Sequence, residues 1–120
     1  MPAAPPAVFE ALTSSKKFAE MTGGRAADIS AQAGGAFKMF GGDISGRNVE
    51  LIPGKLVVQA WRSNAWPEGV YSLCTFRLAP EGKGTKLTFD QVGYPDAAHD
   101  MLSGGWAKMY WEPMTKLLAK

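Results

Sequence analysis

The sequence predicts an α+β fold in which an antiparallel sheet packs against a long C-terminal helix. Apolar residues recur at helical spacing near the N-terminus, alternate with polar residues from 26 to 92, and return to helical spacing after residue 96. Turns rich in glycine and proline separate the alternating segments, which is typical of short antiparallel strands. Because 120 residues with 46% hydrophobic side chains suit one core, a single domain is predicted over residues 1–120.

Two short helices are predicted first. Pro5 and Pro6 suit the first turn of a helix, because proline has no N–H to lose there, and residues 8–12 continue it with apolar side chains at helical spacing. Ser14 and its neighbours interrupt this helix and can cap a second one. Gly23-Gly24 is the predicted end of that second helix.

A meander of five or six strands is predicted next. Short connections between successive strands make neighbours antiparallel, and Pro53-Gly54 suits a type II turn. Alternation places one face of the sheet against the core and the other toward water. The predicted strands are Asp28–Ala31, Ala36–Phe40, Ile44–Ile52, Leu56–Arg62, Val70–Leu78 and Thr85–Val92.

One long helix is predicted from about Ala97 to Ala119, with Asp96 as its N-cap. Gly104 and Gly105 cost about 2 kcal/mol relative to alanine, yet an apolar stripe continues through them, so we expect them to allow close approach to the sheet. This stripe consists of Leu102, Trp106, Met109, Pro113 and Leu117, with Tyr110 on its flank.

Pro113 is predicted to kink this helix. It cannot donate a hydrogen bond to the carbonyl of Met109, so that oxygen should be left free. Two interpretations stay open for the kink. Either it shapes a cavity beneath the helix, or it only adjusts the packing.

The charge and cysteine content exclude several classes of protein. There are 13 basic and 11 acidic residues without a dense basic stripe, so nucleic-acid binding is not expected. No apolar run reaches the roughly 18 residues that span a bilayer, and the first six residues do not form a signal peptide, so a cytoplasmic location is expected without membrane insertion. Cys74 and His99 are the only residues of their kinds, and no metal or other cofactor is predicted.

No catalytic residue is predicted either. His99 lies between two aspartates but has no second histidine or nucleophile near it in sequence, so a surface histidine is expected. Asp90 and Glu50 fall on separate strands, and nothing pairs them across a substrate. Gly82-Lys83-Gly84-Thr85 lacks the spacing of a phosphate loop and is predicted to be a hairpin turn. Cys74 lies in an apolar strand, where an inert buried thiol is expected.

Several sequence segments together resemble the activator of heat-shock-protein-90 ATPase homologue domain, which belongs to the SRPBCC, or START-like, superfamily. The resemblance extends from Pro5 to Leu118. The segments that carry it are Gly46–Lys55, Val58–Arg62, Trp66-Pro67-Glu68-Gly69, Gly84–Thr88, Gly105-Trp106 and Tyr110-Trp111-Glu112-Pro113.

The resemblance implies a helix-grip fold, in which a strongly bent antiparallel sheet wraps around the C-terminal helix and leaves a cavity. Across the superfamily such cavities hold lipids, sterols, hormones, polyketides and other hydrophobic molecules. In eukaryotic relatives the domain is the C-terminal half of a co-chaperone, whose separate N-terminal domain makes major contacts to the chaperone.

The N-terminus departs from the family pattern. Members usually begin with a full strand, whereas Met1 to Ala4 are too few and too close to prolines for a long strand, so the first strand is expected to be short or missing. That strand would pair beside Gly84–Val92. We therefore expect this edge to be covered by a second chain in a homodimer or to be left exposed, with Lys86 and Asp90 as protective charges.

A hydrophobic pocket is predicted on the concave face of the sheet, because such sites combine many aromatic residues with few polar ones. The lining candidates are Phe76, Phe89, Trp106, Met109, Tyr110 and Pro113, and the residues expected to close its mouth are Phe40, Trp61 and Trp66. The alternative is a filled hydrophobic core without an open cavity.

Arg62 is a candidate anchor for a ligand carboxylate or carbonyl. It shares the alternation of Val58 and Ala60, which is interpreted as inward-facing. The alternative is an ion pair with Glu50 or Asp90.

Three functions are weighed, in this order. The first is binding of a hydrophobic or aromatic small molecule, anchored by Arg62 or by the Tyr110 hydroxyl. The second is contact with a chaperone through exposed surface such as the Trp66-Pro67 loop. The third is an enzyme of the cyclase or hydrolase type found elsewhere in the superfamily.

Overall fold

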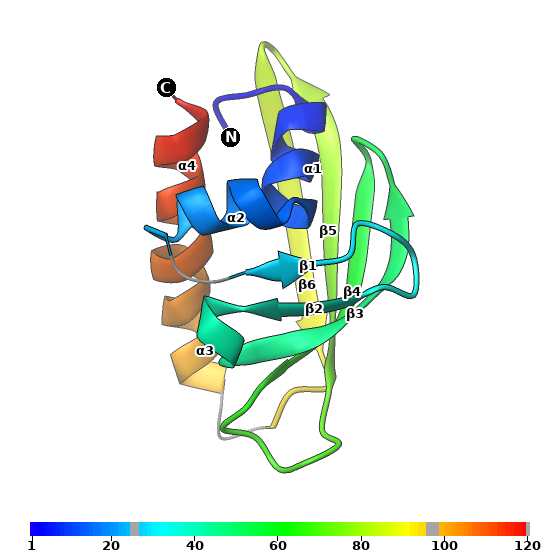
Figure 1. Cartoon of the computed structure of the whole chain (residues 1–120). Helices are drawn as coiled ribbons and strands as arrows, with labels where there is room; N and C mark the ends of the chain where they lie inside the picture. Colours follow the sequence, from blue (N-terminus) through cyan, green and yellow to red (C-terminus); the bar gives the residue numbers. More distant parts are fainter. Residues whose placement is uncertain (25–26, 96–98, 120) are drawn as a thin grey trace.

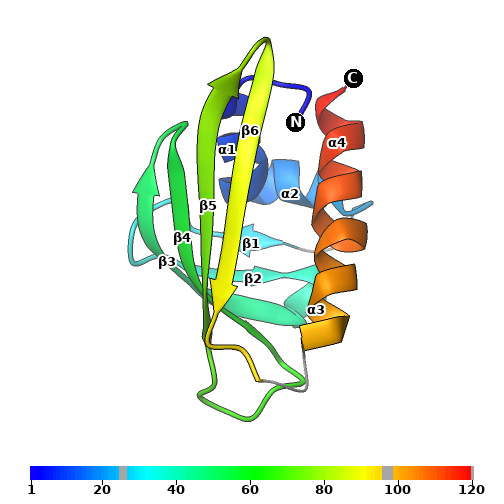
Figure 2. The same cartoon turned by 180° about the vertical axis from the view of Figure 1, so that it is seen from behind.

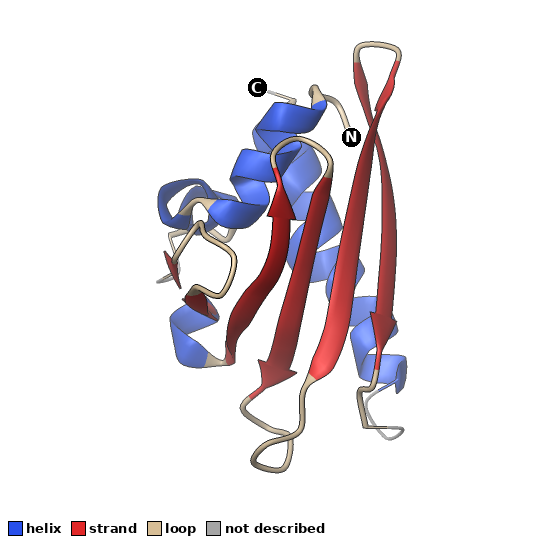
Figure 3. Ribbon diagram, turned by 90° about the vertical axis from the view of Figure 1, so that its right-hand side faces the viewer, coloured by secondary structure: helices blue, strands red, loops and turns tan. Residues whose placement is uncertain are grey.

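A bent antiparallel sheet wraps around the C-terminal helix in the computed structural model, which describes residues 1–24, 27–95 and 99–119, with side chains at all of these except 99–101 and 103 (Figure 1). The described strands pair in sequence order from β1 to β6, so the sheet is the predicted meander. Their bounds are β1 Asp28–Ile29, β2 Ala36–Met39, β3 Ile44–Ile52, β4 Leu56–Ser63, β5 Ser72–Glu81 and β6 Gly84–Val92. The helices all cover one face of this sheet (Figure 3). This architecture confirms the predicted helix-grip fold.

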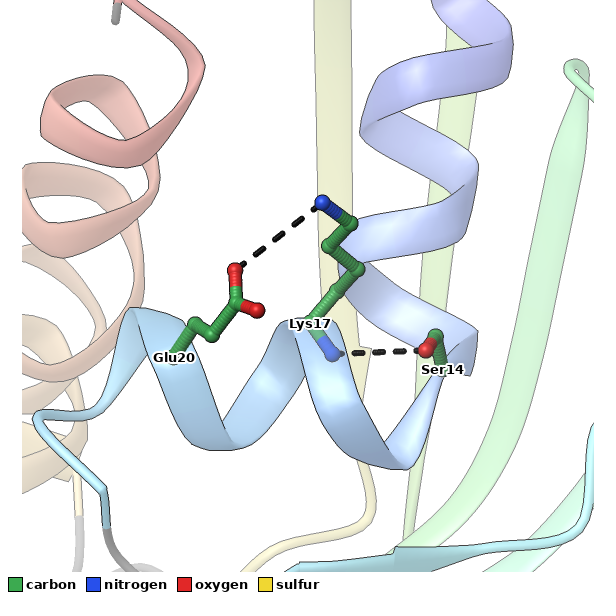
Figure 4. A network of polar contacts seen from close by, with 3 residues as sticks. All are labelled: Ser14, Lys17 and Glu20. Atoms are coloured by element: carbon green, nitrogen blue, oxygen red, sulfur yellow. Dashed lines mark hydrogen bonds and ion pairs between the residues drawn. The ribbon is translucent and has the colours of Figure 1, made fainter.

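The two predicted N-terminal helices are present as α1 Pro5–Thr13 and α2 Ser15–Met21. Ser14 separates them because its backbone is extended and its Oγ accepts a hydrogen bond from the backbone N–H of Lys17, at 3.3 Å. Lys17 also forms an ion pair with Glu20 at 3.9 Å (Figure 4). Val8, Leu12 and Phe18 are fully buried beneath these helices.

Several strand boundaries differ from the prediction by one to three residues, and two of these differences have a clear structural cause. Phe40 was expected to end a strand, but it begins the short 3-10 helix η1 Phe40–Gly42, with a φ of 54°. Gly41 and Gly42 continue with positive φ, and the Phe40 ring packs edge-on against Phe18 at 5.4 Å, which holds this backbone in place. At the other boundary β5 ends at Glu81 rather than at Leu78, because Gly82 and Lys83 alone form the turn to β6.

The bend of the sheet depends on close approach at Gly46 and on a bulge. A Cβ added at Gly46 would collide with the carbonyl oxygen of Ala60 on the neighbouring strand β4. Two residues further, the β3–β4 register shifts between Asn48 and Glu50, which is a β-bulge. Figure 2 shows the outcome, with β1 and β2 lying across the helix while β5 and β6 run along it.

The C-terminal helix is continuous through Gly104 and Gly105, as predicted, and its start at Ala97 and cap at Asp96 lie outside the described residues. It comprises α3 His99–Trp106, the π-helical segment η3 Ala107–Trp111 and α4 Glu112–Leu118. The expected role of the two glycines was wrong. A Cβ added at either would meet nothing within 4 Å, so neither brings the helix closer to the sheet.

A π-helical turn stands where a kink at Pro113 was predicted. The N–H of Glu112 bonds back to the carbonyl of Ala107, and Pro113 falls in the first turn of α4, where no N–H is needed. The buried stripe is correspondingly Trp106, Tyr110 and Met114, while Met109 is 39% exposed. On an α-helix, residues four apart point about 40° away from each other around the helix axis. The π turn has more residues per turn, so it keeps Trp106, Tyr110 and Met114 on one face despite their spacing of four.

The edge of β6 is partly covered by the N-terminus. The Met1 amino group donates to the carbonyl of Thr85 at 2.9 Å, and the N–H of Thr85 donates to the carbonyl of Met1 at 3.0 Å. The Thr85 hydroxyl also donates to the carbonyl of Ala3, at 2.7 Å. Along the rest of β6 the homodimer stays a prediction.

Candidate functional site

A cavity of about 610 Å³ lies at one end of the C-terminal helix. It is bordered by the β4–β5 loop, the η1 turn and the α3 segment, which lie in the lower part of the view in Figure 2, and it opens to solvent on one side. Its volume falls within the range of small-molecule sites, about 300–1,000 Å³. The described lining residues are Phe40, Asp43, Ile44, Trp61, Ser63, Ala65, Trp66, Pro67, Pro95, Leu102, Gly105, Trp106 and Met109.

Five of the ten residues predicted from the sequence line this cavity: Phe40, Trp61, Trp66, Trp106 and Met109. The first three were expected only to close the mouth. Sequence reasoning missed Asp43, Ile44 and Pro95, which reach the cavity because the η1 turn and the chain after β6 fold toward it. Pro67 and Leu102 could have been predicted as lining residues from the sequence. Pro67 neighbours Trp66, and Leu102 begins the predicted apolar stripe of the helix.

The centre of the grip is filled, which corrects the predicted position of the pocket. Phe76 is fully buried and packs against Phe89, with ring centroids 5.0 Å apart, and Phe89 lies 4.3 Å from Trp106. Tyr110 closes the cluster 4.2 Å from Trp106. Aromatic rings from the sheet and from the C-terminal helix therefore fill the space between these two elements. In this region the predicted alternative, a filled hydrophobic core, is the one observed.

Pro113 lies elsewhere. It borders a separate, more polar groove of about 450 Å³ between α2 and α4, whose other described lining residues are Glu20, Met21, Lys108, Glu112, Lys116 and Leu117. The proline thus has no contact with the apolar cavity.

The indole rings of the cavity wall are oriented by hydrogen bonds. Trp106 Nε1 donates to Gln91 Oε1 at 2.8 Å, and Gln91 Nε2 donates to Ser72 Oγ at 3.0 Å. Ser72 Oγ in turn donates to the carbonyl of Trp61 at 2.9 Å, and Trp61 Nε1 donates to the Tyr110 hydroxyl at 3.3 Å. These bonds link α3, β6, β5 and β4, and they hold Trp61 and Trp106 at a centroid distance of 5.2 Å.

Arg62 does not point into the cavity, so its interpretation as an inward anchor was wrong. On β4 the buried positions are Val57, Gln59 and Trp61, which puts Arg62 on the opposite face. Its Nη2 donates to the carbonyls of Trp66 and Pro67 at 2.8 and 3.1 Å, and its Nε donates to the carbonyl of Val70 at 3.3 Å. Arg62 therefore holds the loop that carries Trp66.

The ion-pair alternative for Arg62 is not realised either. Among the residues that the structure describes, the one salt bridge joins Lys17 and Glu20. The guanidinium instead lies over the Tyr71 ring, 5.8 Å from its centroid.

Burial suppresses ionisation beside the cavity. It raises the pKa of the Cys74 thiol to about 12, against the opposing effect of the contact with Ser72. Burial also raises the pKa of the Tyr110 hydroxyl, which is 3% exposed and thus faces the core rather than a ligand. Both groups are neutral at pH 7, and the side chain of His99 lies outside the described residues.

The described residues offer little chemistry beyond apolar contact. Across the side chains of residues 1–24, 27–95, 102 and 104–119, no three histidine, cysteine, aspartate or glutamate residues gather where they could hold a metal ion. None of the described helices is both long and apolar enough to cross a membrane. Asp43 and Ser63 supply the charged and hydroxyl side chains among the described lining residues. The site is therefore suited to holding an apolar molecule.

Comparison with known families gives a match over nearly the whole chain. The family described as Activator of Hsp90 ATPase homolog 1-like protein matches residues 2–119. Activator of 90 kDa heat shock protein ATPase homolog 2 of Mus musculus is 33% identical over 90 residues, which cover 75% of this chain and 27% of the relative. Homolog 1 of Homo sapiens is 33% identical over 86 residues, covering 72% and 25%. The chain thus spans about a quarter of the length of these curated relatives.

Solved structures show the same fold. An Hsp90 activator from Plasmodium falciparum superposes with a TM-score of 0.90 at 23% identity, covering 98% of this chain and 89% of that one. CalU16 from Micromonospora echinospora superposes with a TM-score of 0.81 at 19% identity, covering 99% and 71%.

Proposed function

Because the chain belongs to the family of Activator of Hsp90 ATPase homolog 1-like proteins and its fold contains an apolar cavity, we propose that this cavity is its functional site. The chain binds a hydrophobic or aromatic small molecule there. The observation that carries the proposal is the cavity itself, about 610 Å³ and walled by the indole rings of Trp61, Trp66 and Trp106.

The packing of the walls supports this proposal. Trp61 and Trp106 are held by hydrogen bonds to Tyr110 and Gln91, so the cavity is preformed and a ligand need not order these side chains. Trp66 is half-buried on a loop that Arg62 holds, which places it at the entrance. A planar apolar ligand would stack on these rings.

The test is a thermal-shift and native-mass screen with apolar and aromatic compounds. A ligand at a hundredfold excess over its Kd should stabilise the protein by about 2.7 kcal/mol. Trp66→Ala should weaken binding, whereas Leu73→Ala, at an exposed position on the outer face of β5, should leave it unchanged. Binding that Trp66→Ala and Trp106→Ala both leave intact would place the site elsewhere and refute the proposal.

A second candidate function is contact with a 90 kDa heat shock protein and stimulation of its ATPase. The observation in its favour is the 33% identity to proteins named as activators of that ATPase. The exposed loop with Pro67 and Glu68 is the proposed contact surface, because Arg62 keeps it ordered while it projects from the sheet.

A pull-down with the chaperone and an assay of its ATPase test this second function. Retention that Pro67→Ala and Glu68→Ala weaken supports the loop contact, and absence of both retention and stimulation contradicts it. A small molecule that fills the cavity without changing retention would separate the two functions.

A further inference from the structure

We propose that the ligand of the cavity is a mainly apolar molecule with an uncharged carbonyl group, as in a ketone or an ester, and that the Ser63 hydroxyl donates a hydrogen bond to this carbonyl. The inference rests on the proposed ligand-binding function and names the class of ligand and its polar anchor. It follows from which polar groups of the described wall already have partners and which one faces the cavity with a proton to donate.

Ser63 faces the concave side of the sheet. It ends β4, whose buried positions are Val57, Gln59 and Trp61, so strand alternation places its side chain on that same face. Its partner in register on β3 is Ile44, and both residues line the cavity. The Ser63 side chain is therefore part of the cavity wall rather than of the outer face.

The Ser63 hydroxyl has a proton available for a ligand. Its Oγ accepts a hydrogen bond from the backbone N–H of Ala65 at 3.2 Å. Its own O–H donates to no acceptor in the part of the chain that the structure describes. Because a hydroxyl combines one donor with two acceptor lone pairs, the bond from Ala65 fixes the oxygen and leaves the proton free.

Other polar groups of the wall are less suited to hold a carbonyl. The Nε1–H groups of Trp61 and Trp106 already donate to other side chains. Asp43 has an interaction partner of its own in the protein, and a carboxylate accepts hydrogen bonds but donates none. No described lining residue carries a positive charge, so an anionic ligand group would lose its hydration without gaining a counter-ion.

The depth of each residue gives the ligand an orientation. Phe40, Trp61 and Trp106 are 4%, 4% and 6% exposed and form the inner part of the wall. Ser63 and Trp66 are half-buried, and the backbone N–H of Trp66 donates to the carbonyl of Ser63 at 3.1 Å, so they lie together nearer the mouth. Trp66 Nε1 has no hydrogen-bond partner among the described residues and adds a second donor at this end. The ligand carbonyl thus stays beside the loop, with the apolar body directed inward.

Three probes with one naphthalene body separate the carbonyl from hydrophobicity and charge: methyl naphthyl ketone, isopropenylnaphthalene and naphthoate. The isopropenyl group has the shape of the acetyl group but a methylene in place of the carbonyl oxygen. Binding to the full chain is followed in nitrogen-15 NMR spectra, through the indole signals of Trp61, Trp66 and Trp106 and the amide signal of Ala65. We expect the ketone to shift the Ala65 amide more than the alkene does, and naphthoate to bind at least about tenfold more weakly than the ketone.

Ser63→Ala removes the donor, so the ratio of ketone affinity to alkene affinity should fall about tenfold. A general loosening of the loop would weaken both probes alike and leave this ratio unchanged. Ser63→Thr keeps the hydroxyl and should preserve the ratio. Ser45→Ala is the matched control, because Ser45 pairs with Arg62 on the outer face of the sheet, and it should preserve the ratio as well.

An unchanged ratio in Ser63→Ala would overturn the inference while leaving the proposed binding function standing. Tighter binding of naphthoate than of the ketone would have the same consequence. Binding of no probe would also overturn the inference, and together with a negative compound screen it would overturn the proposed function too.

Discussion

Arg62 determines where the entrance of the cavity lies, although its own side chain is not among the described lining residues. Its guanidinium spans from β4 to three carbonyls of the following loop, at Trp66, Pro67 and Val70. Charged donors to backbone carbonyls are among the stronger hydrogen bonds in proteins. The half-buried Trp66 ring is thereby kept 5.7 Å from Trp61.

Arg62→Met should therefore loosen the loop while keeping most of the side chain's apolar stem. We expect a loss of about 1 kcal/mol in the free energy of unfolding and weaker binding of ligands in the cavity. Urea unfolding and the Trp66 indole signal measure the two effects. Arg77→Met, at an exposed position on β5, is the control and should change neither. An unchanged Trp66 signal in Arg62→Met would contradict this role.

The buried Cys74 and Tyr110 predict how stability depends on pH. An unfolded thiol ionises near pH 8.5, whereas burial raises the folded pKa of Cys74 to about 12. The stabilisation is thus fully present below about pH 8.5 and is lost as the pH rises toward the folded value, by about 1.4 kcal/mol per pH unit. Above about pH 10, Tyr110 adds a loss of the same sign, because burial raises its pKa too.

Urea unfolding between pH 7 and 10 checks this dependence. Cys74→Ala should flatten the slope between pH 8.5 and 10, at the cost of a lower overall stability. A thiol reagent should fail to label the native protein at pH 8 but label it in urea. Rapid labelling of the native protein would show that Cys74 is accessible and would refute the argument.

At the scale of the elements, two glycines differ in whether the structure has room for a side chain at their position. Gly104 is exposed inside α3, and an added Cβ there would meet nothing within 4 Å. Gly46 lies in β3 against the carbonyl of Ala60, where an added Cβ has no room. Alanine substitutions at these two positions therefore measure two different effects. At Gly104 they measure the conformational entropy cost of glycine, and at Gly46 they measure the need for close packing of two strands.

Gly104→Ala should stabilise the protein by about 0.5–1 kcal/mol, because alanine restricts the unfolded chain and favours the helix. Gly46→Ala should destabilise it by about 1–3 kcal/mol through overpacking, or prevent folding. Thermal unfolding of both variants measures the contrast. Destabilisation by Gly104→Ala would mean that the helix interior needs the glycine after all.

The elements were predictable where the evidence for them is local. Turn residues such as Gly82-Lys83 and the cap at Ser14 act on their immediate neighbours, so the order of helices and strands followed from the sequence. Which residues of β4 face the core was not predictable from local evidence. Gln59 is polar but buried, at 1% exposed, and donates to Asn48 Oδ1, so the inward face looked less apolar than the outward one that carries Arg62.

The location of the cavity could not be predicted from the sequence either, for a different reason. Whether Phe76 and Phe89 meet Trp106 or leave a gap depends on how far the sheet bends, and that bend is set by Gly46 and the bulge near Asn48 together. A change of one ring diameter decides between a filled core and a pocket. Such a distance is a property of the whole packing rather than of any one segment.

At the scale of the whole molecule, the outer edge of β6 is where we expect two copies of the chain to associate. Thr85 directs its N–H and C=O to Met1, and alternation along β6 puts those of Leu87, Phe89 and Gln91 on the same edge. If two copies pair antiparallel about Thr88, Lys86 of each lies opposite Asp90 of the other. Such opposite charges stabilise a cross-strand pair, so the predicted homodimer has a defined register.

Light scattering over a range of concentrations tests this dimer, together with amide exchange at Leu87 and Phe89. Lys86→Asp should weaken association by placing like charges opposite each other, and the exchanged pair Lys86→Asp with Asp90→Lys should restore it. A protein that remains monomeric at every concentration, with rapid exchange along this edge, would leave only the exposed-edge alternative.

The π-helical turn gives the C-terminal helix one residue more than an α-helix would use for the same advance. The segments before and after it are consequently out of phase by this surplus residue, which is what allows Trp106 and Met114 to reach the same core. Deleting the exposed Lys108 from this turn would leave Trp106 and Met114 seven residues apart, which an α-helix covers in about two turns. A chain lacking Lys108 should therefore form a regular α-helix in place of the π turn, keep Met114 in the core and retain its cooperative unfolding transition. Loss of that transition in thermal unfolding would contradict this account of the surplus residue.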